Sequence, residues 1–169
     1  MAKVALISSA GGHLTEVLAI AQELKGRHDL FLCVTNYPAV RGMKLEEVQR
    51  IYFAPIFWRE QDSGILLKLR QQIGVMVTMV LWLFTFLRIF WKERPDYLIT
   101  VGAEIAVPAY LINRLFFRRP ALYVESLARI DTPSLTGKLV SRLSDRVFVQ
   151  WQGVLPYYGA KGEYHGRLI

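Results

Sequence analysis

The segment Ser-Ser-Ala-Gly-Gly-His-Leu-Thr-Glu at residues 8–16 joins a pair of glycines to one of the three histidines in the chain. Gly11 and Gly12 let the backbone turn tightly and approach a ligand closely. A helix is expected to begin here, and its free N–H groups and positive dipole end favour an anion. His13 stands at this helix start, and because an imidazole titrates near neutral pH it is the first candidate for a general base. The segment therefore predicts an anion site with a base beside it.

A structural role is the competing interpretation of the same residues. Glycine turns between a strand and a helix often serve packing alone, and a histidine at a helix start can be a cap or a surface residue. The segment does not match a dinucleotide-binding fingerprint, because G-x-G-x-x-G is absent and the next strand ends in Val34-Thr35-Asn36, without an acidic ribose ligand. Carboxylates and histidines show no metal-ligand spacing, so we expect neither a metal nor a cofactor.

Two further polar groups follow predicted strands. Gly102 and Glu104 come after one apolar strand, and Glu125 and Ser126 come after the next. Ligands of parallel α/β sheets bind beyond the carboxyl ends of the strands, so all four residues are expected near His13. Glu104 is the second candidate for the base, and Glu125 is expected to position the substrate.

The elements that must hold these residues follow from hydrophobic periodicity. Strands are expected at 3–8, 29–35, 50–54, 97–101, 121–125 and 146–150, and helices at 13–25, 64–94, 103–117 and 134–143. Short apolar strands that alternate with helices predict an α/β, Rossmann-like fold with a parallel sheet covered on both faces. With 169 residues, the chain is expected to form a single domain over 1–169.

Composition narrows the choice of partners. The net charge of +7 and a sequence pI near 9.7 favour phosphates, nucleic acid or a lipid surface, and a hydrophobic content of 53% favours lipid. The basic residues are scattered and the aromatic residues concentrate in one apolar segment, unlike the stacking platforms of nucleic-acid-binding proteins. We therefore expect no nucleic-acid partner. Cys33 is the only cysteine and suits the reducing cytosol.

Residues 73–87 contain no charge, and the apolar character continues to Trp91. Three interpretations of this segment compete: it could be a buried core helix, a transmembrane span or a helix that dips into one leaflet. A core helix usually keeps a polar face, and a span needs about 20 apolar residues and would separate the two halves of one sheet. Basic residues flank both ends, so no positive-inside asymmetry sets an orientation. We expect a monotopic or peripheral helix at about 64–94. Its expected membrane contacts are Trp82, Phe86 and Phe90 in the lipid and Arg88, Lys92 and Arg94 on the phosphates.

Several segments resemble a known family. The loop at 8–16, "LITVGAEIAVPAYLI" at 98–112, "YVESLARIDTPSLTGKLVSRLSDRVFVQW" at 123–151 and "EYHGRLI" at 163–169 are similar to the acceptor-side subunits of split GT-B glycosyltransferases. These are the PssD/EpsE-type proteins of exopolysaccharide synthesis and their eukaryotic counterpart in dolichol-linked chitobiose formation. The N-terminal half of MurG is a more distant resemblance. The resemblance implies one N-terminal-type half of a GT-B fold.

The resemblance also implies a function. The chain would be a subunit of an inverting, metal-independent enzyme that transfers a sugar from UDP-GlcNAc or a similar UDP-sugar to a polyprenyl-diphosphate-linked sugar. It would sit on the cytoplasmic face of the membrane, and a separate subunit would bind the donor. The base would be His13 or an acidic neighbour. The substrate-binding residues would be Gly11, Gly12, Gly102, Glu125, Ser126, Thr136 and Gly137. A non-catalytic membrane anchor that recruits the donor-binding subunit is the alternative.

Overall fold

The computed structural model describes the backbone of residues 1–56 and 65–169 and the side chains of residues 1–56 and 72–169. These residues form a seven-stranded sheet in the order β3-β2-β1-β4-β5-β6-β7, and every neighbouring pair is parallel. The strands are β1 (Lys3–Ser8), β2 (Asp29–Thr35), β3 (Arg50–Ala54), β4 (Tyr97–Thr100), β5 (Ala121–Val124), β6 (Arg146–Val149) and β7 (Gly162–Tyr164). The expected Rossmann-like parallel sheet is confirmed.

The helices connect these strands as expected. They are α1 (Gly12–Leu24), α2 (Pro38–Arg41), α3 (Ile65–Glu93), α4 (Ala106–Ile112), a π-helical continuation η1 (Asn113–Phe117), α5 (Leu135–Leu143) and the 3-10 segment η2 (Gln152–Lys161). The sequence analysis did not anticipate α2, η2 or β7. The first and last of these are too short to show periodicity, and η2 contains Pro156 and a non-helical Gly159.

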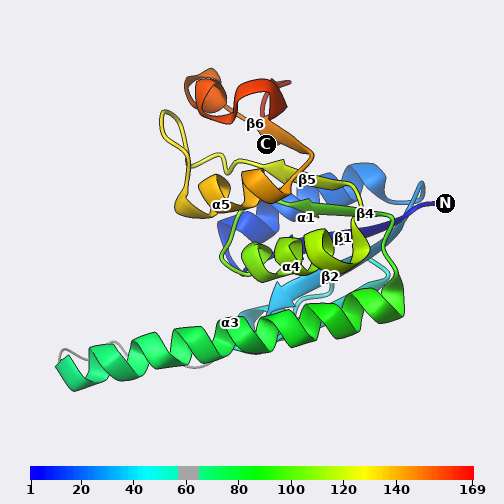
Figure 1. Cartoon of the computed structure of the whole chain (residues 1–169). Coiled ribbons are helices and arrows are strands. Elements are labelled where there is room, and N and C mark those ends of the chain that lie inside the picture. Colours follow the sequence, from blue (N-terminus) through cyan, green and yellow to red (C-terminus); the bar gives the residue numbers. More distant parts are fainter. Residues whose placement is uncertain (57–64) are drawn as a thin grey trace.

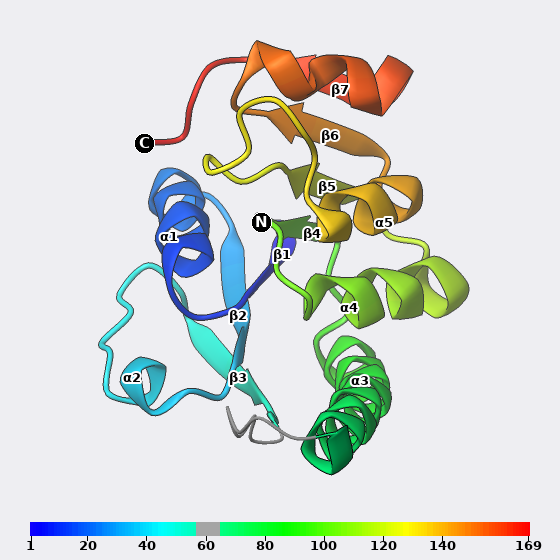
Figure 2. The same cartoon turned by 90° about the vertical axis from the view of Figure 1, so that its left-hand side faces the viewer.

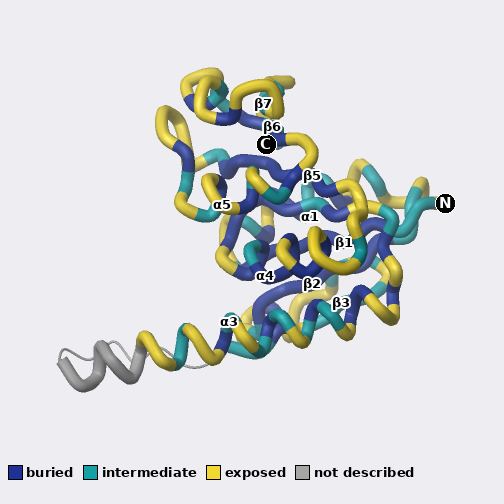
Figure 3. Tube along the Cα trace, viewed as in Figure 1, coloured by how far each residue is buried: buried dark blue, intermediate teal, exposed yellow. Residues whose placement is uncertain are grey.

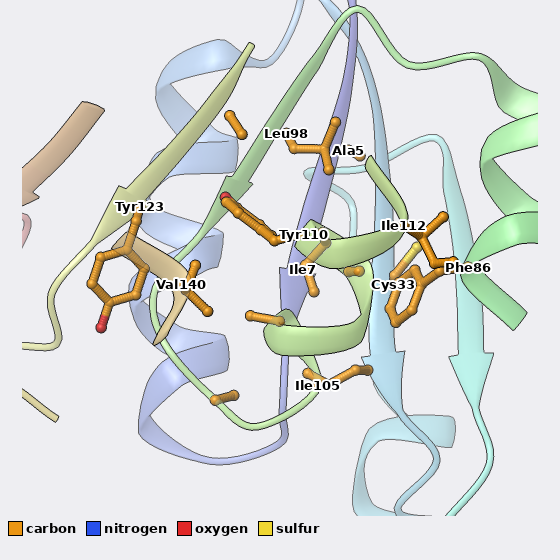
Figure 4. Packing of buried hydrophobic residues seen from close by; sticks show 14 of the residues in the cluster. Ala5, Ile7, Cys33, Phe86, Leu98, Ile105, Tyr110, Ile112, Tyr123 and Val140 are labelled. Atoms are coloured by element: carbon orange, nitrogen blue, oxygen red, sulfur yellow. The ribbon is translucent and has the colours of Figure 1, made fainter. Parts of the chain in front are cut away.

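The sheet lies between two helical layers (Figures 1 and 2). Alternate residues of each strand enter opposite clusters: Ala5 and Ile7 of β1 face the layer of α3, α4 and α5, whereas Leu6 faces α1 and α2. Figure 4 shows the first cluster, in which Phe86 of α3 lies close to Cys33 of β2. This two-sided burial explains why the strands read as nearly continuous apolar runs.

The face of α3 expected to contact lipid is buried instead. Trp82, Phe86 and Phe90 are 3%, 0% and 0% exposed, and the Trp82 indole N–H donates to Pro55 O at 2.5 Å. A crossover helix must pack one stripe against its sheet, and these residues at four-residue spacing form that stripe. The assignment of these three side chains to the membrane is therefore corrected. Among the side chains of α3 from residue 72 onward, the large apolar ones that are exposed are Ile73, Met76, Val77, Val80, Phe84 and Trp91.

Length and composition would allow part of α3 to cross a membrane. Gln72–Glu93 comprises 22 residues with a mean hydropathy of 2.1. Its C-terminal half is held in the core by Trp82 and the residues that follow, whereas the preceding exposed turns project beyond the sheet (Figure 3). Arg88, Lys92 and Arg94 are exposed, and the Lys92 ammonium lies 5.5 Å from the centroid of the Tyr52 ring.

The last residue of α3 is anchored by charge. The Glu93 carboxylate is 6% exposed, lies 3.1 Å from Lys3 Nζ and 3.2 Å from Arg50 Nε, and accepts a hydrogen bond from Tyr52 OH. Burial alone would raise the pKa of Glu93, but the hydrogen bonds from Tyr52 and Lys3 and the charge of Arg50 outweigh it, so the pKa is lowered. Burial, followed by the hydrogen bond to Glu93, raises the pKa of Tyr52 to about 12.

We expect Glu93→Gln to lower the free energy of unfolding by about 2 kcal/mol at pH 7, because the half-buried Lys3 and Arg50 lose the negative charge of this buried partner. A lowered folded-state pKa contributes stability that is complete above the unfolded value of about 4.3 and disappears as pH falls through the folded value. The difference between wild type and variant should therefore shrink below about pH 4. Urea unfolding across this range measures it, with exposed Glu46→Gln as the control. A difference that stays constant with pH would contradict this assignment.

Candidate active site

The candidate site lies where the strand order of the sheet reverses direction. β1 and β4 are neighbours, but the chain builds outward from β1 to β2 on one side and from β4 to β5 on the other. Ligands of open α/β sheets bind at the carboxyl ends of the strands at such a point. Figure 2 looks onto these ends, where the starts of α1, α4 and α5 gather.

Two glycines shape the backbone at this point. Gly11 precedes α1 with φ 90° and ψ −147°, a conformation essentially restricted to glycine. Gly102 follows β4 with φ 80°, and a Cβ there would lie 3.2 Å from His13 Cε1. The imidazole therefore packs directly on Gly102, which joins the loops after β1 and β4. Gly12 is exposed, and a Cβ on it would meet nothing within 4 Å, so open space remains at the start of α1.

A pocket of about 280 Å³ opens beside this contact. It is lined by four of the predicted residues, His13, Glu104, Ser126 and Thr136. The sequence analysis did not single out the remaining lining residues, which are Ala103, Ala128, Arg129, Ser134 and Leu135. Strand-end loops from β1, β4 and β5 and the start of α5 thus form one concave site.

The pocket favours an anion. His13 lies in the first turn of α1 and Thr136 in the first turn of α5, and neither first turn contains an acidic residue. The first N–H groups of a helix have no partner within the helix, so two positive dipole ends meet here. Arg129 is exposed and has no ion-pair partner among the described side chains. Glu104 is the one acidic residue in the lining.

The surroundings of the His13 ring indicate which nitrogen can act. Nδ1 is buried, and within the described residues it has no hydrogen-bond partner. A catalytic histidine normally donates from Nδ1 to a carbonyl or carboxylate, which leaves the Nε2 lone pair free to take a proton. Without such an acceptor, a proton on Nδ1 would be a buried, unsatisfied N–H. The environment therefore favours the tautomer with the proton on Nε2, whose N–H is a hydrogen-bond donor.

Glu125 lies behind the pocket wall and does not line it. Its side chain is 0% exposed, and Oε1 accepts from Tyr123 OH at 2.8 Å while Oε2 accepts from Ser134 N at 3.2 Å and from Tyr158 OH. A Cβ on the buried Gly137 would lie 2.4 Å from Glu125 Oε2. The expected substrate contact of Glu125 and Gly137 is therefore corrected: the carboxylate braces the wall, and the glycine makes room for it.

Burial and the contact with Glu125 also shift the pKa values of the two phenols that donate to it, Tyr123 and Tyr158. Burial and then the charge of Glu125 raise the pKa of Tyr123, and burial and then the hydrogen bond to Glu125 raise the pKa of Tyr158. Both therefore stay protonated as donors at neutral pH. Tyr158 belongs to η2, so the C-terminal segment takes part in bracing the pocket.

Arg129 is the main residue that the sequence analysis missed. It lies five residues beyond the end of β5, in the same strand-end segment as the predicted Ser126. Extending the strand-end rule over that whole segment would have included it. Within the described side chains, no group of three or more His, Cys, Asp or Glu residues could hold a metal ion.

The fold is that of one half of a GT-B structure. The structure is similar to MurG of Acinetobacter baumannii with a TM-score of 0.73 and 21% identity, over 97% of this chain and 45% of that one. UDP-GlcNAc 2-epimerase of Neisseria meningitidis, solved with UDP-GlcNAc, gives a TM-score of 0.69 and 14% identity, over 98% of this chain and 47% of that one. The chain thus spans less than half the length of these solved proteins.

Sequence comparison then identifies the family. The model of the family "Oligosaccharide biosynthesis protein Alg14 like" matches residues 67–168, and the chain belongs to this family. The mouse protein named UDP-N-acetylglucosamine transferase subunit ALG14 is 27% identical over 183 residues, covering 99% of this chain and 83% of its own length. The protein of that name from Saccharomyces cerevisiae is 48% identical over 48 residues, or 28% of this chain and 20% of its own.

Proposed function

We propose that this chain is the acceptor-binding subunit of an inverting glycosyltransferase that uses UDP-GlcNAc or a similar UDP-sugar. The acceptor is a polyprenyl-diphosphate-linked sugar of exopolysaccharide or lipid-linked oligosaccharide synthesis. The observation that carries the proposal is the pocket at the β1–β4 switch point, which is lined by two helix N-termini, Arg129 and Glu104. The names of the relatives as UDP-N-acetylglucosamine transferase subunits support the reaction class.

In this proposal the diphosphate of the acceptor occupies the anion-favouring part of the pocket. Arg129, the exposed start of α1 and the Thr136 end of α5 supply positive charge and N–H donors. Open space over Gly12 leaves room for the ligand to approach the backbone. Ser126 adds a hydroxyl to the lining, although its own proton is donated to Glu16 at 2.9 Å.

Glu104 is the proposed base. Its carboxylate is exposed at the pocket and requires no partner to present a lone pair, unlike His13. As the acceptor hydroxyl oxygen attacks the anomeric carbon, its proton passes to Glu104 and UDP leaves with the electron pair of the broken C–O bond. His13 donates a hydrogen bond from Nε2 to an oxygen of the bound substrate, and Gly102 holds the imidazole in place. No step requires a metal or a cofactor.

The exposed stripe of α3 is the proposed membrane contact. The turns of α3 that begin at residue 72 project from the side of the sheet at which the carboxyl ends of the strands lie and the pocket opens (Figures 1 and 3). Attachment there places the pocket near the headgroups, where a polyprenyl diphosphate is exposed. Arg88, Lys92 and Arg94 are exposed and suit lipid phosphates. We place this attachment on the cytoplasmic face, as a peripheral or monotopic contact.

A separate donor-binding subunit completes the proposed enzyme. The likeness to MurG covers 45% of that chain, and the described residues form one sheet. We place the docking surface at the carboxyl edge and the C-terminal residues 151–169. An apolar pocket of about 300 Å³ lies under the end of this segment, between Ile20 of α1 and Leu168.

The test of this function is dependence on the partner. Purified alone, the chain is expected to transfer no sugar and to bind UDP-sugars with little affinity, whereas co-expression with the donor-binding subunit restores transfer to a polyprenyl-diphosphate sugar. Calorimetry with UDP-GlcNAc and a radiolabel transfer assay measure the two states. Tight nucleotide binding by the isolated chain would contradict the assignment of donor binding to a separate subunit. The alternative, a non-catalytic anchor, predicts that pocket variants leave the activity of the complex intact.

A further inference from the structure

Glu16 is a buried carboxylate that the proposed chemistry does not use. It lies in the second turn of α1, is 4% exposed, and accepts three hydrogen bonds. Oε1 accepts from Ser126 Oγ at 2.9 Å, and Oε2 accepts from Leu127 N at 3.0 Å and from Gln150 Nε2 at 2.6 Å. Burying a carboxylate is costly unless hydrogen-bond donors compensate it, and these three donors supply that compensation.

Two of the three donors, Ser126 Oγ and Leu127 N, belong to the loop that forms one wall of the pocket. Ser126, Ala128 and Arg129 line the pocket, and Leu127 lies between them. The N–H of Leu127 is held by Glu16, and its carbonyl accepts from the Trp151 indole N–H at 2.7 Å. The backbone N–H of Leu127 is therefore hydrogen-bonded to α1, and its backbone carbonyl is hydrogen-bonded to the segment after β6.

The C-terminal tail completes the same network. Gln150 Nε2 also donates to Glu125 O at 3.1 Å, and Gln150 Oε1 accepts from Leu168 N at 2.9 Å. The Arg167 guanidinium lies 3.7 Å from the centroid of the Trp151 ring. The side chains that hold Leu127 are thus themselves oriented by the tail.

We propose that Glu16 is a positioning residue that sets the 126–129 loop and thereby holds Arg129 against the diphosphate of the acceptor. The role of Arg129 rests on the proposed function, whereas the holding of the loop does not. An apolar residue at position 16 would leave the Leu127 N–H and the Gln150 amide without their acceptor, and the loop would shift to satisfy them. A displacement of about 1 Å in a binding group is enough to weaken productive binding strongly.

Glu16→Leu and Glu16→Gln form a matched pair for the test. A glutamine at position 16 keeps an acceptor oxygen for Leu127 N and Gln150, and its NH₂ group can donate to Ser126 Oγ, because a hydroxyl also accepts. In the complex with the donor-binding subunit, we expect Glu16→Leu to raise KM for the polyprenyl-diphosphate acceptor at least about tenfold. KM for the UDP-sugar and kcat at saturating acceptor should change little. Glu16→Gln should stay within about threefold of wild type in every constant.

Amide hydrogen exchange on the full-length chain alone gives a readout that needs no activity. The Leu127 N–H and the Arg129 N–H, which donates to Ser126 O at 2.9 Å, should exchange faster in Glu16→Leu and normally in Glu16→Gln. If the wild-type complex transfers no sugar, the proposed function fails while exchange still tests the positioning role. The inference would be overturned if a folded Glu16→Leu variant had the same amide exchange rates and the same KM for the acceptor as the wild type. Equal losses in both variants would also overturn it, because charge and not hydrogen-bond geometry would then be responsible.

Trp151→Phe covers the case in which Glu16→Leu does not fold. This change removes the indole N–H that the Leu127 carbonyl accepts and keeps an aromatic ring for Arg167. Faster exchange at residues 127–129, with acceptor KM raised about threefold and kcat retained, would support the positioning of the loop. Unchanged exchange in this variant would overturn it.

Discussion

Glu104→Gln, assayed in the complex with the donor-binding subunit, is expected to lower kcat by at least about 100-fold, because a positioned base typically contributes about 10²- to 10⁴-fold. Glutamine keeps the size of the side chain but cannot take the proton of the acceptor hydroxyl. Glu104 is exposed at the pocket, so the variant should retain its stability and its partner. Steady-state kinetics with saturating acceptor and UDP-sugar measure the loss.

Variants of His13 separate a base from a donor at the same site. If His13 donates from Nε2, His13→Ala should lose about 100-fold in kcat, as the removal of one preorganised donor does elsewhere. His13→Gln, whose amide N–H can replace the imidazole donor, should recover to within about tenfold of wild type. A base cannot be replaced in this way. A His13→Gln variant as inactive as His13→Ala, together with an active Glu104→Gln, would return the role of base to His13.

Met76→Ser/Val80→Ser/Phe84→Ser is expected to release the protein from vesicles with at least about a 100-fold fall in the partition constant, because apolar burial drives attachment. These side chains are 69%, 50% and 66% exposed on the outer stripe of α3, so the fold should persist. Sedimentation with vesicles that contain anionic lipid, and circular dichroism, measure the two properties. High salt should weaken wild-type binding only in part, since it screens the basic residues but not apolar contact.

The matched control lies on the opposite stripe of the same helix. Trp82→Ser/Phe86→Ser/Phe90→Ser replaces the same number of apolar residues, but these are buried and their loss should unfold the domain. Unchanged sedimentation of the outer-stripe variant would refute attachment through α3. Release by the inner-stripe variant in a folded state would show that the wrong stripe has been assigned to the lipid.

Local sequence pattern determined the order of the elements and the edge at which the site forms. Apolar strands and amphipathic helices are recognised from residues that are close in the sequence. All six predicted strands, and the two helices that follow β1 and β5, therefore begin within a residue or two of their predicted starts. The residues that follow strands share one edge of a parallel sheet by construction. For that reason the sequence pattern predicted that His13, Glu104 and Ser126 lie near one another, whereas Thr136 was implied by the family resemblance alone. The structure places all four in one pocket.

Tertiary structure alone decided which side chains face inward. α3 is apolar on both sides, so periodicity could not distinguish the stripe of Trp82 from the stripe of Phe84. Glu125 and Ser126 are adjacent, yet only Ser126 reaches the pocket, because Glu125 is drawn inward by donors from distant segments. The partners of Glu16 lie 110 to 134 residues away along the chain. Such contacts depend on how the helices and the C-terminal tail pack against the sheet, and no local pattern in the sequence encodes that packing.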